Sequence, residues 1–366
     1  MALVKFPHKV GFYATLKSRV DEEFNHSHAR QKGNWPMYLK AAVIVGGYIG
    51  TYIALVFFCS HWLLAVVLGF LLSQFYVLVG FNIQHDGTHE SFSSHKAINR
   101  LAGLGLDFLG ASSTLWKHRH NFIHHTYTNI THVDDDLETM GILRLSPHQE
   151  WKPWHRFQHL YFPGVYGILS AYWIYFSDFQ KLAAGKLGNY ELPRLSPQEL
   201  ITFFGARIFY VGYSVVLPCF FHPLWQVALA NFLILFVVGM NLSLVFNLAH
   251  VMGVNDFPMP ENGDMENEWA VHQVLTSANF APQNPWVSWY TGGLNCQIEH
   301  HLFPTICHIH YPRLQKIVQQ TCAEFGIRYM AYPTVAEAVV QHIDFLKQLG
   351  QPPAVAVPVA ADLARL

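Results

Sequence analysis

The sequence is poor in charge, and it has neither a basic excess nor paired cysteines. Charged residues make up 13% of the 366 residues, whereas soluble domains have about 25%, and the formal net charge is −1. Without a basic excess to neutralise phosphates, we predict no nucleic-acid partner. The five cysteines show no CxxC spacing, which argues against a zinc knuckle or a disulfide framework and predicts reduced thiols. Disorder is excluded, because 51% of the residues are hydrophobic.

The hydrophobic residues fall into long runs, and four of these runs are long enough to cross a membrane. A transmembrane helix needs about 20 apolar residues, a length that each of these runs reaches. The predicted spans are 38–59, 62–83, 200–221 and 224–249. Within each pair of spans the connection is very short, Ser60-His61 in the first and His222-Pro223 in the second. The sequence therefore predicts an all-α integral membrane protein with four transmembrane helices in two hairpins.

Two further apolar runs have a composition unlike that of a plain span. Residues 160–176 are rich in aromatic side chains and are interrupted by Pro163-Gly164, and such aromatic enrichment is typical of the membrane–water interface. Residues 97–115 are rich in glycine and other small residues and contain Asp107. We expect both runs to form interfacial helices.

The domain organisation follows from the position of the spans. No cleavable signal peptide is visible, because a polar segment, residues 1–37, precedes the first apolar run. Lysines and arginines in this segment favour a cytoplasmic N-terminus. A single membrane domain is expected over residues 38–340, followed by a tail, residues 341–366, whose end from Gln351 onward is expected to be loosely ordered.

Histidine is the residue that the sequence has in excess, with 23 copies, as many as lysine and arginine together. Four clusters stand at the ends of apolar runs, and their candidate ligands are His85 and His89, then His120, His124 and His125, then His250 alone, and finally His300 and His301 after Gln297. An i,i+4 spacing puts two imidazoles on one face of a helix, which suits a shared metal ion. Neutral imidazole is a common metal ligand, and an imidazole set without cysteine suits Zn, Cu, Fe or Ni alike.

The positions of the clusters constrain the membrane topology. A shared metal site requires all clusters to lie on one side of the bilayer, so the chain must cross it an even number of times between His89 and His250. The predicted pair of spans at 200–249 supplies two crossings, which leaves the run at 160–176 at the interface. With a cytoplasmic N-terminus and two spans before His85, the histidine clusters form a cap that faces the cytoplasm.

At these clusters the sequence resembles the integral-membrane fatty acid desaturases, which have three histidine boxes in this order and spacing. The local matches are 82–86 (NIQHD), 120–129 (HNFIHHTYTN) and 295–304 (NCQIEHHLFP), and the resemblance extends over about residues 34–340. The third box has Gln297 where most of the family has histidine, as in the front-end subgroup, whose members act between an existing double bond and the carboxyl end. The run through 304–312 (PTICHIHYP) is similar to bacterial and cyanobacterial Δ6-type acyl-lipid desaturases.

The resemblance implies a cofactor and a set of ligands. The family uses two iron ions in a non-haem di-iron centre, with O2 as co-substrate. By motif, the metal ligands are His85, His89, His120, His124, His125, His250, His300 and His301, and Gln297 is a possible further site residue. Stearoyl-type desaturases have an asparagine one helical turn before the last-span histidine, but Phe246 stands there in this chain, with Asn247 beside it. That asparagine's role is therefore not transferred.

The resemblance also implies the partners. The substrate is expected to be an acyl-lipid, or alternatively an acyl-CoA or acyl-ACP. Many eukaryotic front-end enzymes carry an N-terminal cytochrome b5 domain with an HPGG motif, which is absent from residues 1–37. Electrons are therefore expected from a separate donor, ferredoxin first and cytochrome b5 second. The expected location is a bacterial inner membrane or a cyanobacterial membrane.

The residues around the boxes are less specific. Acids that could orient the metal ligands are Asp86, Glu90, Asp107, Asp134, Asp135, Asp136, Glu266, Glu268 and Glu299, although the three consecutive aspartates fit a solvated loop as well. Tryptophans that could line an acyl tunnel or anchor the chain at the interface are Trp116, Trp269, Trp286 and Trp289. The roles of His118, His132, His272, His308 and His310 stay open.

Other functions fit parts of this pattern. A related di-iron acyl hydroxylase, or a methyl-end (Δ12 or ω3) desaturase, would use the same boxes. A histidine-rich membrane metal transporter or haem carrier is a different class, in which ligands are expected inside the spans along a pathway. The clusters instead lie at span ends and in loops, which favours the enzyme.

Overall fold

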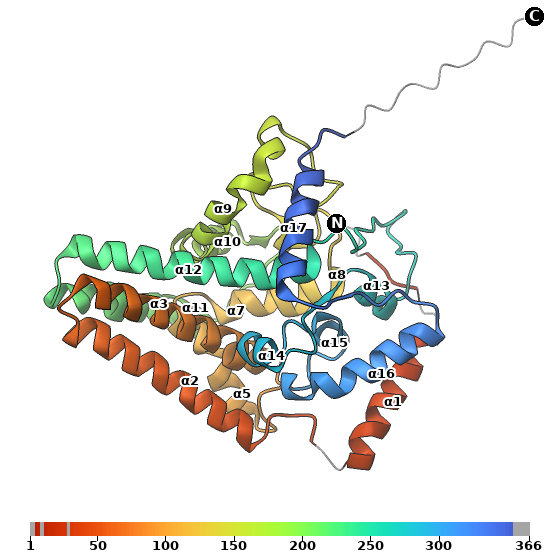
Figure 1. The fold of residues 1–366 in the computed structure, drawn as a ribbon, viewed down its shortest axis with the longest axis horizontal. Coiled ribbons are helices and arrows are strands. Elements are labelled where there is room, and N and C mark those ends of the chain that lie inside the picture. The colour runs from red at the N-terminus through yellow and green to blue at the C-terminus, as the bar shows by residue number, and fades with distance from the viewer. Residues whose placement is uncertain (1–3, 8–10, 28–29, 354–366) are drawn as a thin grey trace, which may run out of the picture.

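The computed structural model describes residues 4–7, 11–27 and 30–353, and it is built almost entirely of helices (Figure 1). Only two short strand pairs accompany the helices in this described part: β1 (Lys186–Leu187) with β2 (Tyr190–Glu191), antiparallel, and β3 (Asn279–Phe280) with β4 (Ala331–Tyr332), parallel. The predicted all-α class is confirmed. Residues 354–366 of the predicted tail lie outside the described residues.

Four helices in the described part of the chain are long and apolar enough to cross a membrane: Trp35–Phe58, Trp62–Thr88, Pro197–Phe220 and Leu224–His250. They coincide with the four predicted spans, which confirms a membrane protein. The first long helix consists of α2 (Trp35–Ile53) and η1 (Ala54–Phe58), and the second of α3 (Trp62–Val79), η2 (Gly80–Gln84) and α4 (His85–Thr88). The third consists of α11 (Pro197–Val211), η7 (Gly212–Val216) and η8 (Pro218–Phe220), and the fourth is α12 (Leu224–His250). The second helix runs on to Thr88, past the predicted end at residue 83.

Local signals at the helix starts explain where these helices begin. The Asn34 side chain accepts a hydrogen bond from the Met37 N–H at 3.3 Å and caps α2. Ser196 and Glu199 form a reciprocal capping box at the start of α11, where Pro197 occupies the first turn. The outer faces of the long helices carry large apolar side chains such as Ile208, which is 74% exposed and suits contact with lipid.

Four of the shorter helices, α1, α13, α15 and α16, form a cap at one end of the long helices. In Figure 1, α2, α3 and α12 run side by side through one half of the molecule, and α1, α13, α15 and α16 gather beyond their ends. The bounds of these and the other α-helices are α1 (Phe12–Ser27), α5 (Lys96–Gly103), α6 (Gly105–Phe108), α7 (Ser113–Trp116), α8 (His125–Tyr127), α9 (Gln158–Tyr172), α10 (Asp178–Ala184), α13 (Trp269–Leu275), α14 (Pro285–Thr291), α15 (Gln297–Leu302), α16 (Tyr311–Glu324) and α17 (Val335–Leu349).

The two runs expected at the interface are helical and are not among the four long apolar helices. Residues 160–176 lie in α9 and the following turn η6 (Trp173–Ser177), and α9 packs along α12. Residues 97–115 break into three short helices, α5, α6 and α7. The expected domain end at residue 340 falls inside α17, which packs against α9 and α12.

Wide π-helical turns occur next to two histidine clusters. One is η2, directly before His85, and the other is η3 (Lys117–His124), which contains His120 and His124. A π turn inserts an extra residue per turn and often marks a functional site. Although the second cluster is π-helical, the rings of His120 and His124 still lie side by side, with their centroids 5.3 Å apart.

Candidate metal centre

The eight predicted metal ligands come together at the junction between the long helices and the cap. The first cluster lies at the end of the α3–α4 helix, and His250 is the last residue of α12. The second cluster comes from η3 and α8, and the third from α15. All eight imidazoles are buried, with no more than 6% of any residue exposed. Segments more than 200 residues apart in sequence therefore build one histidine-lined centre.

The imidazoles form two groups. One nitrogen each from His85, His89, His120 and His300 lies within 4.8 Å of the others, and the same holds for His124, His250 and His301. His125 lies between the groups. Its Nε2 is 3.3 Å from the Nε2 of His120, and its ring stacks on that of His301 with the centroids 4.3 Å apart.

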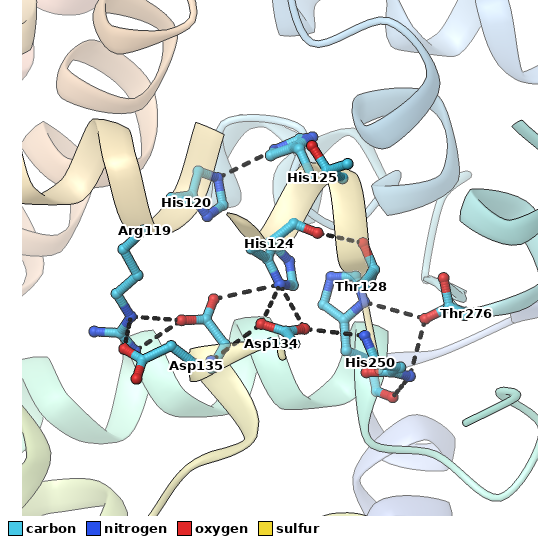
Figure 2. A network of polar contacts seen from close by, with 12 residues as sticks. Arg119, His120, His124, His125, Thr128, Asp134, Asp135, His250 and Thr276 are labelled. Atoms are coloured by element: carbon cyan, nitrogen blue, oxygen red, sulfur yellow. Dashed lines mark hydrogen bonds and ion pairs between the residues drawn. The ribbon is translucent and has the colours of Figure 1, made fainter. Parts of the chain in front are cut away.

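Four of these histidines have one ring nitrogen fixed by a specific partner. The Nδ1 of His124 lies 3.0 Å from Asp134 Oδ2, and that of His250 lies 3.2 Å from the carbonyl oxygen of Thr276 (Figure 2). The Nδ1 of His300 lies 3.1 Å from the Tyr311 hydroxyl, and that of His301 lies 2.8 Å from Gln273 Oε1. In each case Nε2 is the nitrogen left for coordination, which is the arrangement that metal-bound histidines need.

Unpartnered buried nitrogens show that the site fits a metal. The Nε2 atoms of His89, His124 and His300 are buried and have no hydrogen-bond partner. Buried polar atoms are almost always hydrogen-bonded, so this concentration of unpartnered nitrogens requires a group that accepts lone pairs. A metal ion bound to neutral imidazoles satisfies that requirement.

Burial keeps most of these imidazoles neutral. Desolvation and the neighbouring histidines lower the pKa of His89, His120, His125, His300 and His301 well below the ordinary value. Burial also lowers the pKa of His124, but the carboxylates of Asp134 and Asp136 outweigh it and raise the pKa above the ordinary value. At neutral pH each imidazole whose pKa is lowered therefore keeps a ring-nitrogen lone pair that can bind a metal ion.

The three consecutive aspartates are part of the centre rather than a solvated loop. Asp134 is buried and contacts His124, while Asp136 pairs with Arg119 at 2.7 Å. Asp135 contacts Arg119 at 3.2 Å (Figure 2). It also binds Lys181. Two cations thus offset Asp135 and Asp136, while Asp134 makes the shorter contact with His124 and Asp136 lies 3.5 Å from the same ring nitrogen.

Gln297 lies in the group that contains His250 and His301. Its side-chain nitrogen is 2.9 Å from the Nε2 of His250 and 3.4 Å from that of His301, while its Oε1 has no hydrogen-bond partner. Amide oxygen and nitrogen are assigned from such contacts, and the opposite orientation turns the carbonyl oxygen toward the two imidazoles. Gln297 therefore lies within contact distance of two of the predicted ligands, and its role as a ligand stays a prediction.

The other acids named from the sequence lie outside the two groups. Glu299 is buried and binds Asn279 and Tyr329, and burial raises its pKa to about 7. Glu268 accepts from the backbone of Tyr13, and Asp107 accepts from the backbone of Ser113 at 3.4 Å. Asp86 contacts His308. Glu90 and Glu266 belong to neither histidine group in the described part of the chain.

Five histidines have roles that the sequence leaves open, and of these only His308 contacts Asp86, the acid that follows His85. His272 is buried, and its Nε2 lies 2.9 Å from the carbonyl oxygen of Thr128. The Nε2 of His310 lies 3.3 Å from the carbonyl oxygen of Lys32, and His132 is an exposed residue 3.5 Å from Glu138. His118 is half-buried in η3 and joins neither group.

Sequence reasoning missed three orienting groups: the Tyr311 hydroxyl, the Gln273 side chain and the Thr276 carbonyl. Each reaches a histidine from another segment, and none has a spacing that marks it in the sequence. The Asn247 side chain donates to the Ser243 carbonyl at 2.8 Å.

An apolar cavity runs from the first histidine group into the long helices. Its lining includes His85 and six apolar or aromatic residues, Tyr76, Leu106, Leu109, Trp116, Ile174 and Phe246. Trp116 stacks on His120 with the centroids 4.5 Å apart, so one of the four tryptophans named from the sequence is a wall. Trp269 donates its indole N–H to the His125 carbonyl at 3.1 Å, whereas Trp286 and Trp289 are exposed.

Known proteins are similar to this chain over most of its length. A sequence profile described as fatty acid desaturase matches residues 60–333. The chain is 38% identical to an sn-1 linoleoyl-lipid 6-desaturase of Synechocystis, over 95% of this chain and 98% of that protein. It is 36% identical to the protein of the same name in Arthrospira platensis, over 94% of both, and 35% identical to an acyl-lipid (8-3)-desaturase of Physcomitrium patens, over 93% of this chain and 72% of that one. The chain belongs to the fatty acid desaturase family.

Proposed function

We propose that this desaturase is a di-iron enzyme that places a cis double bond in a lipid-linked acyl chain, on the carboxyl side of an existing one. The reaction removes two hydrogens from adjacent carbons and, with two electrons and two protons from outside, reduces O2 to two waters. The observation that carries this proposal is the pair of buried histidine groups beside an apolar cavity.

The ligands in this proposal are the eight histidines His85, His89, His120, His124, His125, His250, His300 and His301, with Gln297 at a ninth position. When bound, the two irons supply with O2 the oxidising power that side-chain acids and bases lack for an alkyl C–H bond. Iron is favoured over zinc by the family, because imidazole softness alone does not distinguish these metals.

The protein's own residues have the task of holding the acyl chain and excluding water. Each methylene moved from water into the cavity contributes roughly 0.8 kcal/mol, so a long chain binds without polar contacts. Trp116 and Phe246 border the cavity beside the imidazoles, and Tyr76 and Leu109 lie further into the long helices. The depth of the cavity beyond His85 then sets which carbon pair faces the metal centre.

Front-end regiochemistry is supported by two observations. Gln297 stands in the third box, and the two cyanobacterial relatives are named as 6-desaturases of linoleoyl groups in lipids. The electron donor is proposed to be an external ferredoxin, or cytochrome b5. The metal centre is proposed to face the cytoplasm, where such a donor would reach the cap.

Product analysis tests the reaction. The gene is expressed in a bacterial host fed linoleate, and the double-bond positions in lipid-bound fatty acids are located by gas chromatography and mass spectrometry. A new double bond on the carboxyl side of the existing one is expected. A hydroxylated product, or a new bond on the methyl side, would reject this proposal in favour of the hydroxylase or the methyl-end desaturase.

Metal analysis tests the centre independently of activity. Purified protein should hold about two irons per chain, and His124→Ala and His301→Ala should each lose iron. His132→Ala is the matched control, because His132 is exposed and lies outside both groups. Full iron content in the first two variants would refute the assignment of these ligands.

A further inference from the structure

A second buried polar cluster lies beside the four-histidine group and has no role in the proposed reaction. It joins three distant segments: Lys40 in α2, Asp86 in α4, and Cys307 and His308 at η9 (His308–His310). His308 Nδ1 is 2.8 Å from Asp86 Oδ2, and Cys307 Sγ is 3.2 Å from the same oxygen. On the far side of the His308 ring, Nε2 is 3.2 Å from the ammonium of Lys40.

The Lys40 ammonium determines which nitrogen of His308 carries the proton. An ammonium group only donates hydrogen bonds, so Nε2 of His308 must accept and Nδ1 must be the N–H. His308 therefore donates to Asp86, and the Cys307 thiol donates to the same carboxylate oxygen. This hydrogen-bond direction also argues against a third metal site at Asp86, Cys307 and His308, because the histidine nitrogen that faces the other two groups is protonated.

The two donors occupy one oxygen of Asp86 and leave the other for His85. Asp86 Oδ1 lies 4.0 Å from the Nδ1 of His85, which has no hydrogen-bond partner of its own. The opposite nitrogen of His85 points into the four-histidine group, 3.2 Å from the Nε2 of His120. Metal-bound histidines usually donate their outer N–H to a carboxylate or carbonyl, and Asp86 is the carboxylate placed for this.

The positive charge of Lys40 balances the negative charge of Asp86 across the His308 ring. Asp86 is 2% exposed, and a carboxylate this deeply buried is costly unless a cation pairs with it. Lys40 supplies that charge through the neutral ring of His308. Its ammonium is held from the other side by Trp289, whose ring centroid is 5.0 Å away.

We propose that Lys40, His308 and Asp86 form a triad that orients His85, so that His308 is a positioning residue of the metal centre. This inference rests on the proposed function, because it takes His85 to be a metal ligand. Lys40 fixes the tautomer of His308, His308 fixes the rotamer of Asp86, and Asp86 holds its Oδ1 on the side of the outer nitrogen of His85, 4.0 Å away. The triad acts on the four-histidine group alone, since it contacts no member of the group of His124, His250 and His301.

Cobalt titration of the metal-free, full-length protein in detergent tests the triad without using activity. In His308→Leu, one of the two Co2+ sites should bind about 10–100-fold more weakly, with its visible absorption altered, while the other is unchanged. His308→Asn should restore most of the affinity, because the asparagine amide can donate to Asp86 from the position of Nδ1. Lys40→Met, at a half-buried residue, should weaken the same site even if His308→Leu fails to fold.

The matched control is His310→Leu, which removes another buried histidine of η9 that bonds to the Lys32 carbonyl and not to Asp86. It should bind two Co2+ ions as the wild type does. Unchanged Co2+ affinity in His308→Leu and Lys40→Met, or an equal loss in His310→Leu, would overturn the triad while leaving the proposed function standing. A wild-type protein that takes up no Co2+ or iron would overturn both.

Discussion

At the residue scale, the sequence identifies the histidines but not most of the groups that hold them. The eight imidazoles could be predicted because clusters such as His120, His124 and His125 repeat a ligand residue at short spacing. Asp134 could also be named, because it is an acid close in sequence to its partner. Tyr311 and Gln273 could not, because an isolated tyrosine or glutamine that reaches its histidine from another helix leaves no pattern in the sequence.

Asp134 and Asp135 offer a direct test of how a single carboxylate supports the centre. Asp134→Asn replaces an acceptor of the His124 N–H with an amide, so we expect iron or Co2+ affinity to fall about 10–100-fold. Asp135→Asn is the matched control, because Asp135 contacts Arg119 and Lys181 and makes no contact with His124. Metal titration of both purified variants measures the difference. Equal affinities would show that Asp134 does not orient His124.

At the element scale, the four spans could be predicted because a membrane helix is encoded by its own apolar run. Their ends could not be predicted as well. The apolar run of the second span stops at Ile83, but the helix continues through Gln84 and Asp86, because those polar side chains are buried by the cap. The π turns were also missed, because nothing in local composition distinguishes a π turn from an α turn.

Close contact between α9 and α12 depends on glycine. A Cβ added at Gly239 would lie 2.5 Å from the carbonyl oxygens of Tyr166 and Gly167, and backbone atoms cannot move aside as a side chain can. We expect Gly239→Ala to destabilise the protein by about 1–3 kcal/mol through overpacking, measured as a lower Tm in detergent. Gly205→Ala in α11 is the control, because nothing lies within 4 Å of its added Cβ. Its Tm should be unchanged or higher, and a Tm of Gly239→Ala at the wild-type value would contradict the close contact.

The attachment of α17 should depend on pH. His342 is buried between the Tyr166 hydroxyl, 2.9 Å from its Nε2, and the Val251 carbonyl, 2.8 Å from its Nδ1. Burial lowers its pKa to about 4 from 6.5, so the unfolded chain takes up the proton first as the pH falls. Its contribution is therefore fully present above pH 6.5 and decreases between pH 6.5 and 4, by about 2 kcal/mol at pH 5.

His342→Gln removes this titration. Thermal unfolding at pH 7.5 and pH 5 should show a smaller loss of Tm for the variant than for the wild type. An equal loss in both proteins would assign the pH dependence to other groups.

At the scale of the whole molecule, the end of α4 and the end of α12 meet in the same histidine centre, and the cap covers that end of the long helices. If both helices cross the membrane, their ends must emerge on the same side to reach one site, and the number of crossings between His89 and His250 is then even. This conclusion needs only the joint position of the histidines. The sequence could supply it through the parity of spans, but it could not show how the cap residues pack.

The side of the membrane can be tested with the protein's own cysteines. Cys59 and Cys219 are partly exposed near the ends of the long helices away from the histidine centre, whereas Cys296, Cys307 and Cys322 are buried. If the cap faces the cytoplasm, a membrane-impermeant maleimide added to intact spheroplasts should label Cys59 and Cys219.

A cysteine introduced at exposed Ala14 in α1 reports on the cap side. In a background with Cys59→Ser and Cys219→Ser, Ala14→Cys should be protected in intact spheroplasts and labelled after lysis, because it lies on the side of the metal centre. Labelling of Ala14→Cys from outside, with Cys59 and Cys219 protected, would invert the topology. The electron donor would then have to reach the cap from the opposite side of the membrane, which a cytoplasmic ferredoxin cannot do. A result that rejects the proposed orientation would therefore also reject the proposed donor.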